Sequence, residues 1–188
     1  LKGVDWDDPT VEQLAERRGQ HPVEVMIDLS LANENQVYVQ PLVNESPDEV
    51  LGILRHQRTL ATFSDSGAHV SQIMDSSLQT HLLSHWVREK QAFTLEEAVK
   101  MITCDTATQF GFHDRGLLRE GMAADMVVFD PDTVAPRMPE VVTDLPANAR
   151  RLRQKADGMR ATIVNGQVLL RDNEPTGNLP GRLLRKKR

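Results

Sequence analysis

Helix-start signals recur through the first 111 residues and predict five helices. Pro9 and Pro22 stand where proline suits a first helical turn, and Gly19 stops the first run. Two of the helices open with Ser or Thr followed three residues later by Glu, which is the pattern of a capping box. We therefore expect helices over residues 7–19, 21–33, 46–57, 78–90 and 94–111.

Two short apolar runs lie between these helices and read as strands. Residues 36–43, QVYVQPLV, alternate and are rich in β-branched side chains, and residues 59–65, TLATFSD, end an apolar run at Asp65. A loop over 66–77 follows. The resulting order of helix, strand, helix, strand favours a parallel α/β sheet or barrel.

The pattern changes after Gly111, where glycines, turns and β-branched runs dominate. Residues 126–129, MVVF, predict a strand, and residues 161–170, ATIVNGQVLL, place Asn-Gly between two strand halves, which is a strong hairpin signal. Residues 146–157 are expected to hold a short helix. The chain thus divides into an α/β body over 1–112, a β unit with a short helix over 113–175 and a basic tail over 176–188.

Composition fits a globular protein that is long enough to bury a core. The chain has 188 residues, 39% of them hydrophobic, and a net charge of -5, which excludes a nucleic-acid footprint for the whole molecule. No apolar run approaches the roughly 20 residues that span a bilayer. The single cysteine, Cys104, suits a reducing compartment and a buried helix position, so we expect a cytoplasmic protein. The first residue is Leu1, and the opening reads like the middle of a longer protein.

Asp65 is the candidate for chemistry, since a carboxylate there ends a buried-looking strand. In parallel barrels the C-terminal strand ends form the active face, where a carboxylate can bind a metal or hold a water. Gly67 would allow a tight turn beside a ligand, and His69 lies close in sequence. The alternative is a plain turn or cap, because Ser64, Asp65 and Ser66 all favour such positions.

Several segments together resemble the C-terminal part of the amidohydrolase superfamily, nearest to the N-acyl-D-amino-acid deacylase (D-aminoacylase) type. The resemblance runs from about residue 10 to the end of the chain. Its most specific part is DRGLLREGMAADMVVFD, which is followed at a distance by IVNGQVLL. The other segments are FSDSGAH, LSHWVREKQAFTLEEAVKMIT and ATQFGFHDRGLLREGMAADMVVFDPDTV.

This resemblance implies a metal-dependent hydrolase that cleaves a carbon–nitrogen bond, with an N-acyl-D-amino acid as one candidate substrate. The implied fold is the C-terminal strands and helices of a (β/α)8 barrel, plus part of a small β-sandwich. Asp65 matches the aspartate that ends the eighth barrel strand. That residue ligates or approaches the metal, expected here to be zinc, and moves a proton from the attacking water to the leaving nitrogen.

The remaining metal ligands of the family have no counterpart in the chain. It contains no His-x-His pair, and of its six histidines only His69 lies beside the matched motif. We therefore expect the C-terminal portion of a longer enzyme, inactive alone, whose partners are the missing N-terminal barrel portion and a small-molecule amide substrate. Neither nucleic acid nor a membrane is expected as a partner, and a homo-oligomer is left open. A degenerate, non-catalytic amidohydrolase-like module is the alternative.

No Lys or Arg occurs between Arg58 and Arg88, so the loop after Asp65 offers no cation to bind a substrate carboxylate. Ser66, His69 or Ser71 would offer neutral hydrogen bonds instead, and we assign Ser66, Gly67 and His69 to substrate binding. His81 and His85 share a helix face by their i, i+4 spacing. A structural role in anchoring the loop is favoured for this pair, with substrate contact as the alternative.

Overall fold

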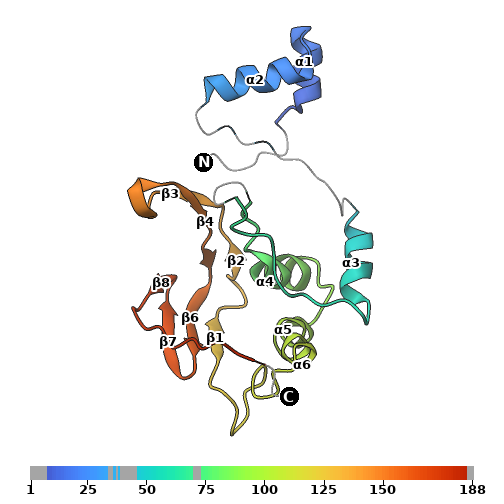
Figure 1. The fold of residues 1–188 in the computed structure, drawn as a ribbon. Helices are drawn as coiled ribbons and strands as arrows, with labels where there is room; N and C mark the ends of the chain where they lie inside the picture. Colours follow the sequence, from blue (N-terminus) through green and yellow to red (C-terminus); the bar gives the residue numbers. More distant parts are fainter. Residues whose placement is uncertain (1–7, 34–35, 37, 39–45, 70–72, 186–188) are drawn as a thin grey trace. The chain divides into compact units, whose positions relative to one another are not determined.

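The computed structural model describes residues 8–33, 36, 38, 46–69 and 73–185. The chain divides into two compact units, Leu1–Ser46 and Pro47–Arg188 (Figure 1). Each unit is described by itself. No helix in the described part of the chain is long and apolar enough to cross a membrane.

The first unit contains the two helices that the sequence predicts, α1 (Val11–Arg18) and α2 (Pro22–Ala32). Thr10 and Gln13 form a capping box at the start of α1, and Gly19 ends that helix with a φ of 62°. The buried residues of the pair are Ala15 and Val25. The strand expected over 36–43 lies almost wholly outside the described residues.

The helices of the second unit also follow the prediction. They are α3 (Pro47–Arg55), a continuous helix made of α4 (Leu78–His81) and η1 (Leu82–Glu89), and a second made of α5 (Leu95–Lys100), η2 (Met101–Asp105) and α6 (Thr106–Gln109). The segments η1 and η2 are wound as π-helix. The expected Thr94–Glu97 capping box is present, with both reciprocal hydrogen bonds.

The sheet of the second unit is antiparallel and has the order β1-β6-β7-β8. Its strands are β1 (Met126–Phe129), β6 (Met159–Val164), β7 (Gln167–Arg171) and β8 (Glu174–Pro175). The predicted hairpin is confirmed: Asn165 and Gly166 connect β6 and β7 with φ values of 47° and 78°. A type I′ turn requires both residues to have positive φ, and Asn-Gly adopts it readily.

Two short antiparallel ladders adjoin this sheet. They pair β2 (Ala135–Pro136) with β5 (Ala156–Asp157), and β3 (Glu140–Val142) with β4 (Arg151–Arg153). The prediction of a short helix over 146–157 is therefore wrong. The only helical part there is one 3₁₀ turn at Pro146–Asn148. Pairing with distant strands decided the conformation here, because β4 and β5 find ladder partners that local propensity cannot reveal.

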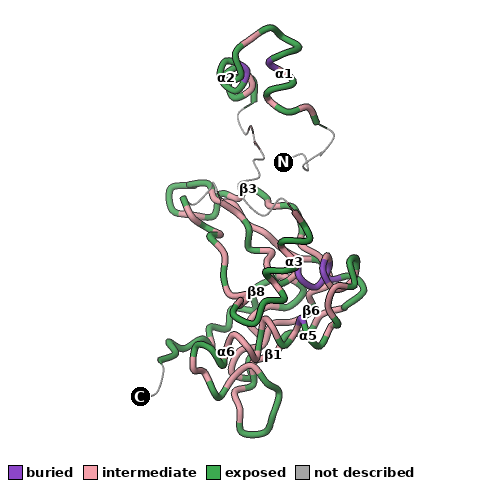
Figure 2. Tube along the Cα trace, turned by 90° about the vertical axis from the view of Figure 1, so that its right-hand side faces the viewer, coloured by how far each residue is buried: buried purple, intermediate pink, exposed green. Residues whose placement is uncertain are grey.

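The core of the second unit lies between the helices and the β segments. Its buried members are Leu82, Leu83, Trp86, Ala98 and Val134, with flanking contacts from α3, β1 and β6. Figure 2 shows that such buried positions are few and that most of this unit is half-buried or exposed. This small cluster thus joins helices and strands.

The expected strand over 59–65 is not formed. Residues 59–65 make no ladder with any described strand, and a strand exists only through such hydrogen bonds to a neighbour. The described residues form a mixed helix and antiparallel-sheet structure, and neither a barrel nor a sandwich is complete within them.

Candidate functional site

A tight loop follows Asp65 and fixes the backbone on its C-terminal side. The Asp65 carbonyl accepts a hydrogen bond from Ala68 N at 2.9 Å, and Gly67 N donates to Ile73 O at 3.0 Å. Gly67 and His69 have φ values of 91° and 53°. A glycine is suited to such a backbone angle, whereas a histidine at positive φ is uncommon. The loop is therefore a hydrogen-bonded turn.

The sequence-predicted site residues differ in their exposure. Asp65, Gly67 and His69 are exposed, whereas Ser66 is half-buried. Ser64 Oγ accepts a hydrogen bond from Ser66 N at 3.2 Å, which is the local turn contact that the alternative interpretation expects.

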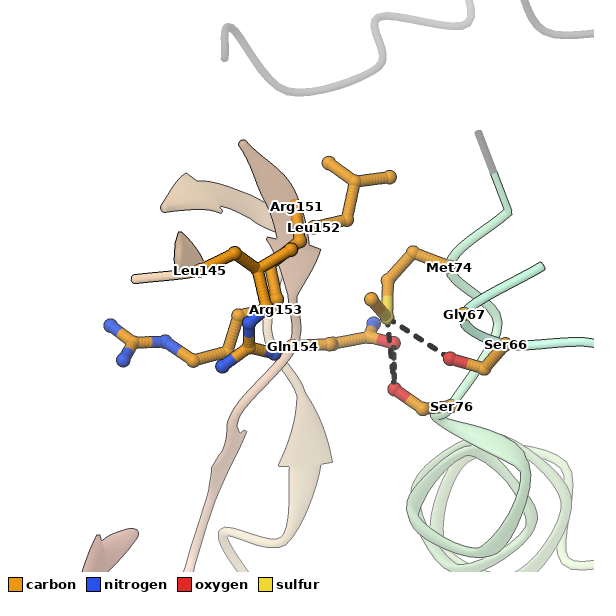
Figure 3. A pocket seen from close by; sticks show the side chains of 9 residues that line it. All are labelled: Ser66, Gly67, Met74, Ser76, Leu145, Arg151, Leu152, Arg153 and Gln154. Carbon is orange, nitrogen blue, oxygen red and sulfur yellow. Dashed lines mark hydrogen bonds between the residues drawn. The ribbon is translucent and has the colours of Figure 1, made fainter. Parts of the chain in front are cut away.

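A chain of side-chain contacts links this loop to the β unit (Figure 3). Ser66 Oγ and Ser76 Oγ each donate to the Met74 sulfur at 3.2 Å. Ser76 Oγ also lies 3.1 Å from Gln154 Oε1. The loop is thus connected through Met74 and Ser76 to a residue far along the sequence.

A pocket of about 440 Å³ lies between this loop and β4. Among the predicted residues, Ser66 and Gly67 line it, whereas Asp65 and His69 do not. The other lining residues are Met74, Ser76, Leu145, Arg151, Leu152, Arg153 and Gln154. The structure therefore brings together two of the four predicted residues at this pocket.

Sequence reasoning missed the contribution of β4 to the pocket. The run Arg151–Leu152–Arg153–Gln154 alternates charged with other residues, which is a strand pattern that the helix prediction for 146–157 concealed. Figure 3 shows Gln154 extending toward Ser76, whereas Arg153 extends to the opposite side of the strand.

The two pocket arginines are held by carboxylates of the β unit. Arg151 forms two hydrogen bonds with Asp144, at 2.6 and 2.7 Å, and Arg153 Nε donates to Glu140 Oε1 at 2.9 Å. The hydrogen bonds from Arg151 lower the pKa of Asp144 below its ordinary value. Both arginine charges are thus compensated by carboxylates within the β unit.

His81 and His85 lie on one helix face, as their spacing predicts. Their rings stack with centroids 4.9 Å apart, and His85 Nδ1 lies 3.0 Å from Glu89 Oε2. Burial, followed by the charge on His85, lowers the pKa of His81 below 6.5. Neither histidine lines the pocket beside the Asp65 loop. Within the described ranges, no group of three His, Cys, Asp or Glu residues is arranged to hold a metal ion.

Comparison of the sequence with known protein families identifies the family of this chain. Residues 2–170 match the model of the amidohydrolase family, so the chain belongs to that family. This match includes Asp65, its loop and both sequence segments on which the resemblance depended.

Individual proteins of known function and structure are similar to parts of this chain. An N-acyl-D-glutamate deacylase from Alcaligenes xylosoxydans xylosoxydans is 39% identical over 107 residues, which is 57% of this chain and 20% of that enzyme. A solved D-aminoacylase mutant in complex with copper chloride aligns with a TM-score of 0.59 at 29% identity. That alignment covers 94% of this chain and 34% of the other.

A second solved D-aminoacylase has a TM-score of 0.56 at 29% identity, over 89% of this chain and 32% of that one. That enzyme has a binuclear metal centre. The chain therefore spans about a fifth to a third of the length of these relatives.

Proposed function

We propose that this chain is the C-terminal part of a metal-dependent amidohydrolase that cleaves the amide bond of N-acyl-D-amino acids. The observation that carries the proposal is the family match over residues 2–170. The similarity to an N-acyl-D-glutamate deacylase and to D-aminoacylase supports the choice of substrate class.

In the proposed whole enzyme, the helices and the segment 59–65 belong to the last part of a (β/α)8 barrel. The antiparallel strands after residue 112 belong to a small β unit beside it, and residues 176–188 form a basic tail. The family match over residues 2–170, which includes residues 59–65 and most of the strands after residue 112, supports this arrangement.

The proposed chemistry assigns Asp65 two tasks. Its exposed carboxylate can offer one ligand position to a metal ion, and three or four positions are needed, so the other ligands belong to other parts of the whole enzyme. Bound zinc would supply a water whose pKa lies near neutrality. Asp65 would accept the proton of the attacking water and deliver it to the leaving nitrogen, as a general base and then acid.

Substrate contacts are proposed for the loop that follows Asp65. Ser66 and Gly67 line the pocket, and the exposed His69 offers a ring nitrogen from the same turn. Ser66 and His69 would hold the amide substrate by hydrogen bonds, and Gly67, whose N–H is bonded to Ile73 O, would leave room for it.

The test is an activity screen of the full-length protein that contains this chain. N-acyl-D-amino acids, their L-enantiomers and cyclic amides would be compared before and after metal removal and zinc addition. We expect hydrolysis of the D-substrates, its loss on chelation and its recovery with zinc, and we expect no activity from residues 1–188 alone. Full-length protein that hydrolyses none of these compounds even after zinc addition would instead support the non-catalytic module.

A further inference from the structure

We propose that Gln154 is a positioning residue for Asp65, acting through Ser76 and Met74 on the loop that follows the carboxylate. The inference rests on the proposed function, since it assigns Gln154 a part in the same reaction. It gives the β unit a defined role in the chemistry of the α/β part.

Gln154 is itself held firmly between two strand ladders. It follows β4 and precedes β5, and its Nε2 donates to Arg137 O at 2.8 Å. Arg137 N in turn donates to Lys155 O at 2.9 Å. These bonds fix the orientation of the amide, because Arg137 O requires the NH2 group and leaves Oε1 directed toward Ser76.

The contacts continue from Gln154 to the residue next to Asp65. Ser76 Oγ lies 3.1 Å from Gln154 Oε1 and 3.2 Å from the Met74 sulfur, and Ser66 Oγ donates to the same sulfur at 3.2 Å. A serine hydroxyl has one proton, so Ser76 shares it between an amide oxygen and a thioether. The amide oxygen is the stronger acceptor, and this bond therefore sets where Ser76 lies.

The Asp65 loop needs such support from outside. Residues 59–65 have no ladder partner among the described strands, and Asp65 itself is exposed. Thr106 Oγ1 donates to Ala61 O at 3.1 Å, four residues before Asp65. The position of the carboxylate then depends on this bond, on the turn and on the contacts of Ser66. A displacement of about 1 Å at a reacting group can cost about a hundredfold in rate, so an anchor of this kind affects turnover.

The first experiment compares Gln154→Ala with Gln167→Ala, an exposed glutamine at the start of β7, in the full-length enzyme. We expect Gln154→Ala to lower kcat about tenfold, because loop misplacement disturbs the reacting geometry, and to raise KM as well, because Ser66 and Gly67 of the same loop are proposed substrate contacts. Ser76→Ala should produce the same loss, and Ser76→Thr, which keeps the hydroxyl, should restore most of it. Gln167→Ala should leave kcat unchanged.

A double-mutant cycle with Asp65→Asn distinguishes positioning from a general structural role. If Gln154 acts through Asp65, Gln154→Ala should cost little further turnover once the carboxylate is gone. An undiminished loss in the Asp65→Asn background would overturn the inference while leaving the proposed hydrolase intact. Unchanged kcat in Gln154→Ala would overturn it as well.

A readout independent of activity separates this inference from the proposed function. The methyl NMR signal of Met74 should shift and broaden in Gln154→Ala but not in Gln167→Ala, whether or not the protein hydrolyses any substrate. If this signal moves and the wild-type protein shows no hydrolysis, the proposed function fails and the contact itself is supported. An unmoved Met74 signal would overturn the inference directly.

Discussion

Arg115 and Asp125 form an ion pair within the segment 114–130, and both side chains bond to Asn165 of the segment 163–170. Arg115 Nη1 contacts Asp125 Oδ2, and Arg115 Nη2 donates to Asn165 Oδ1 at 3.0 Å. Asp125 Oδ1 also accepts from Asn165 N at 2.8 Å. The aspartate before β1 and the Asn-Gly hairpin between β6 and β7 are thus held by one arginine, which gives a physical reason for these segments occurring together.

Loss of this ion pair should destabilise the second unit. Asp125→Ala leaves Arg115, whose side chain is 15% exposed, without its main partner. We expect the free energy of unfolding to fall by about 2 kcal/mol, because a hydrogen-bonded charge is left poorly solvated. Chemical denaturation measures this. Asp144→Ala is the control: it breaks the more exposed pair with Arg151, and a loss as large as that of Asp125→Ala would contradict the prediction.

Gly158 allows a close approach of two backbones, and its substitution should be costly. A Cβ at this position would lie 2.5 Å from Val134 N and 2.7 Å from Val134 Cα, and φ is 70°. Gly158→Ala should lower the free energy of unfolding by about 3 kcal/mol, through overpacking and left-handed strain. Gly177→Ala is the matched control, since its φ is 89° and nothing lies within 4 Å. Equal losses in the two variants would show that strain alone matters.

The stacked histidines should make stability depend on pH. Burial, followed by the charge on His85, lowers the pKa of His81 in the folded state below 6.5. The unfolded chain takes up this proton near pH 6.5 and the folded chain resists it, so stability is full above 6.5 and falls as the pH drops through the folded-state pKa. Two-dimensional NMR would follow the titration. His85→Gln should raise the pKa of His81, whereas His113→Gln should leave it unchanged, and no difference between these variants would contradict the assigned cause.

Asp65→Asn tests the proposed catalytic carboxylate. In the full-length enzyme we expect turnover to fall by at least about a hundredfold, because the amide cannot accept the proton of the attacking water. Steady-state hydrolysis of an N-acyl-D-amino acid measures the effect. Asp75→Asn, an exposed aspartate of the same stretch, should retain wild-type turnover. Near-normal activity in Asp65→Asn would leave that residue a turn former only.

Local signals were enough to predict several elements from the sequence. The capping box at Thr94, the proline-led helices α2 and α3 and the Asn165–Gly166 turn are each encoded within a few residues. Such short-range hydrogen bonds and backbone preferences form wherever the segment lies. The same locality made Asp65 recognisable as a candidate, through its place between an apolar run and a glycine turn.

Only the tertiary structure decided which segments pair and which residues meet at the loop. It made strands of 151–153 and 156–157, left 59–65 without a ladder and brought Gln154 to Ser76 across 78 positions of sequence. Strand pairing and pocket lining depend on partners distant along the chain, and a local sequence pattern does not identify those partners. The sequence by itself thus determined the helices, the hairpin and the family, while long-range pairing determined the surroundings of Asp65.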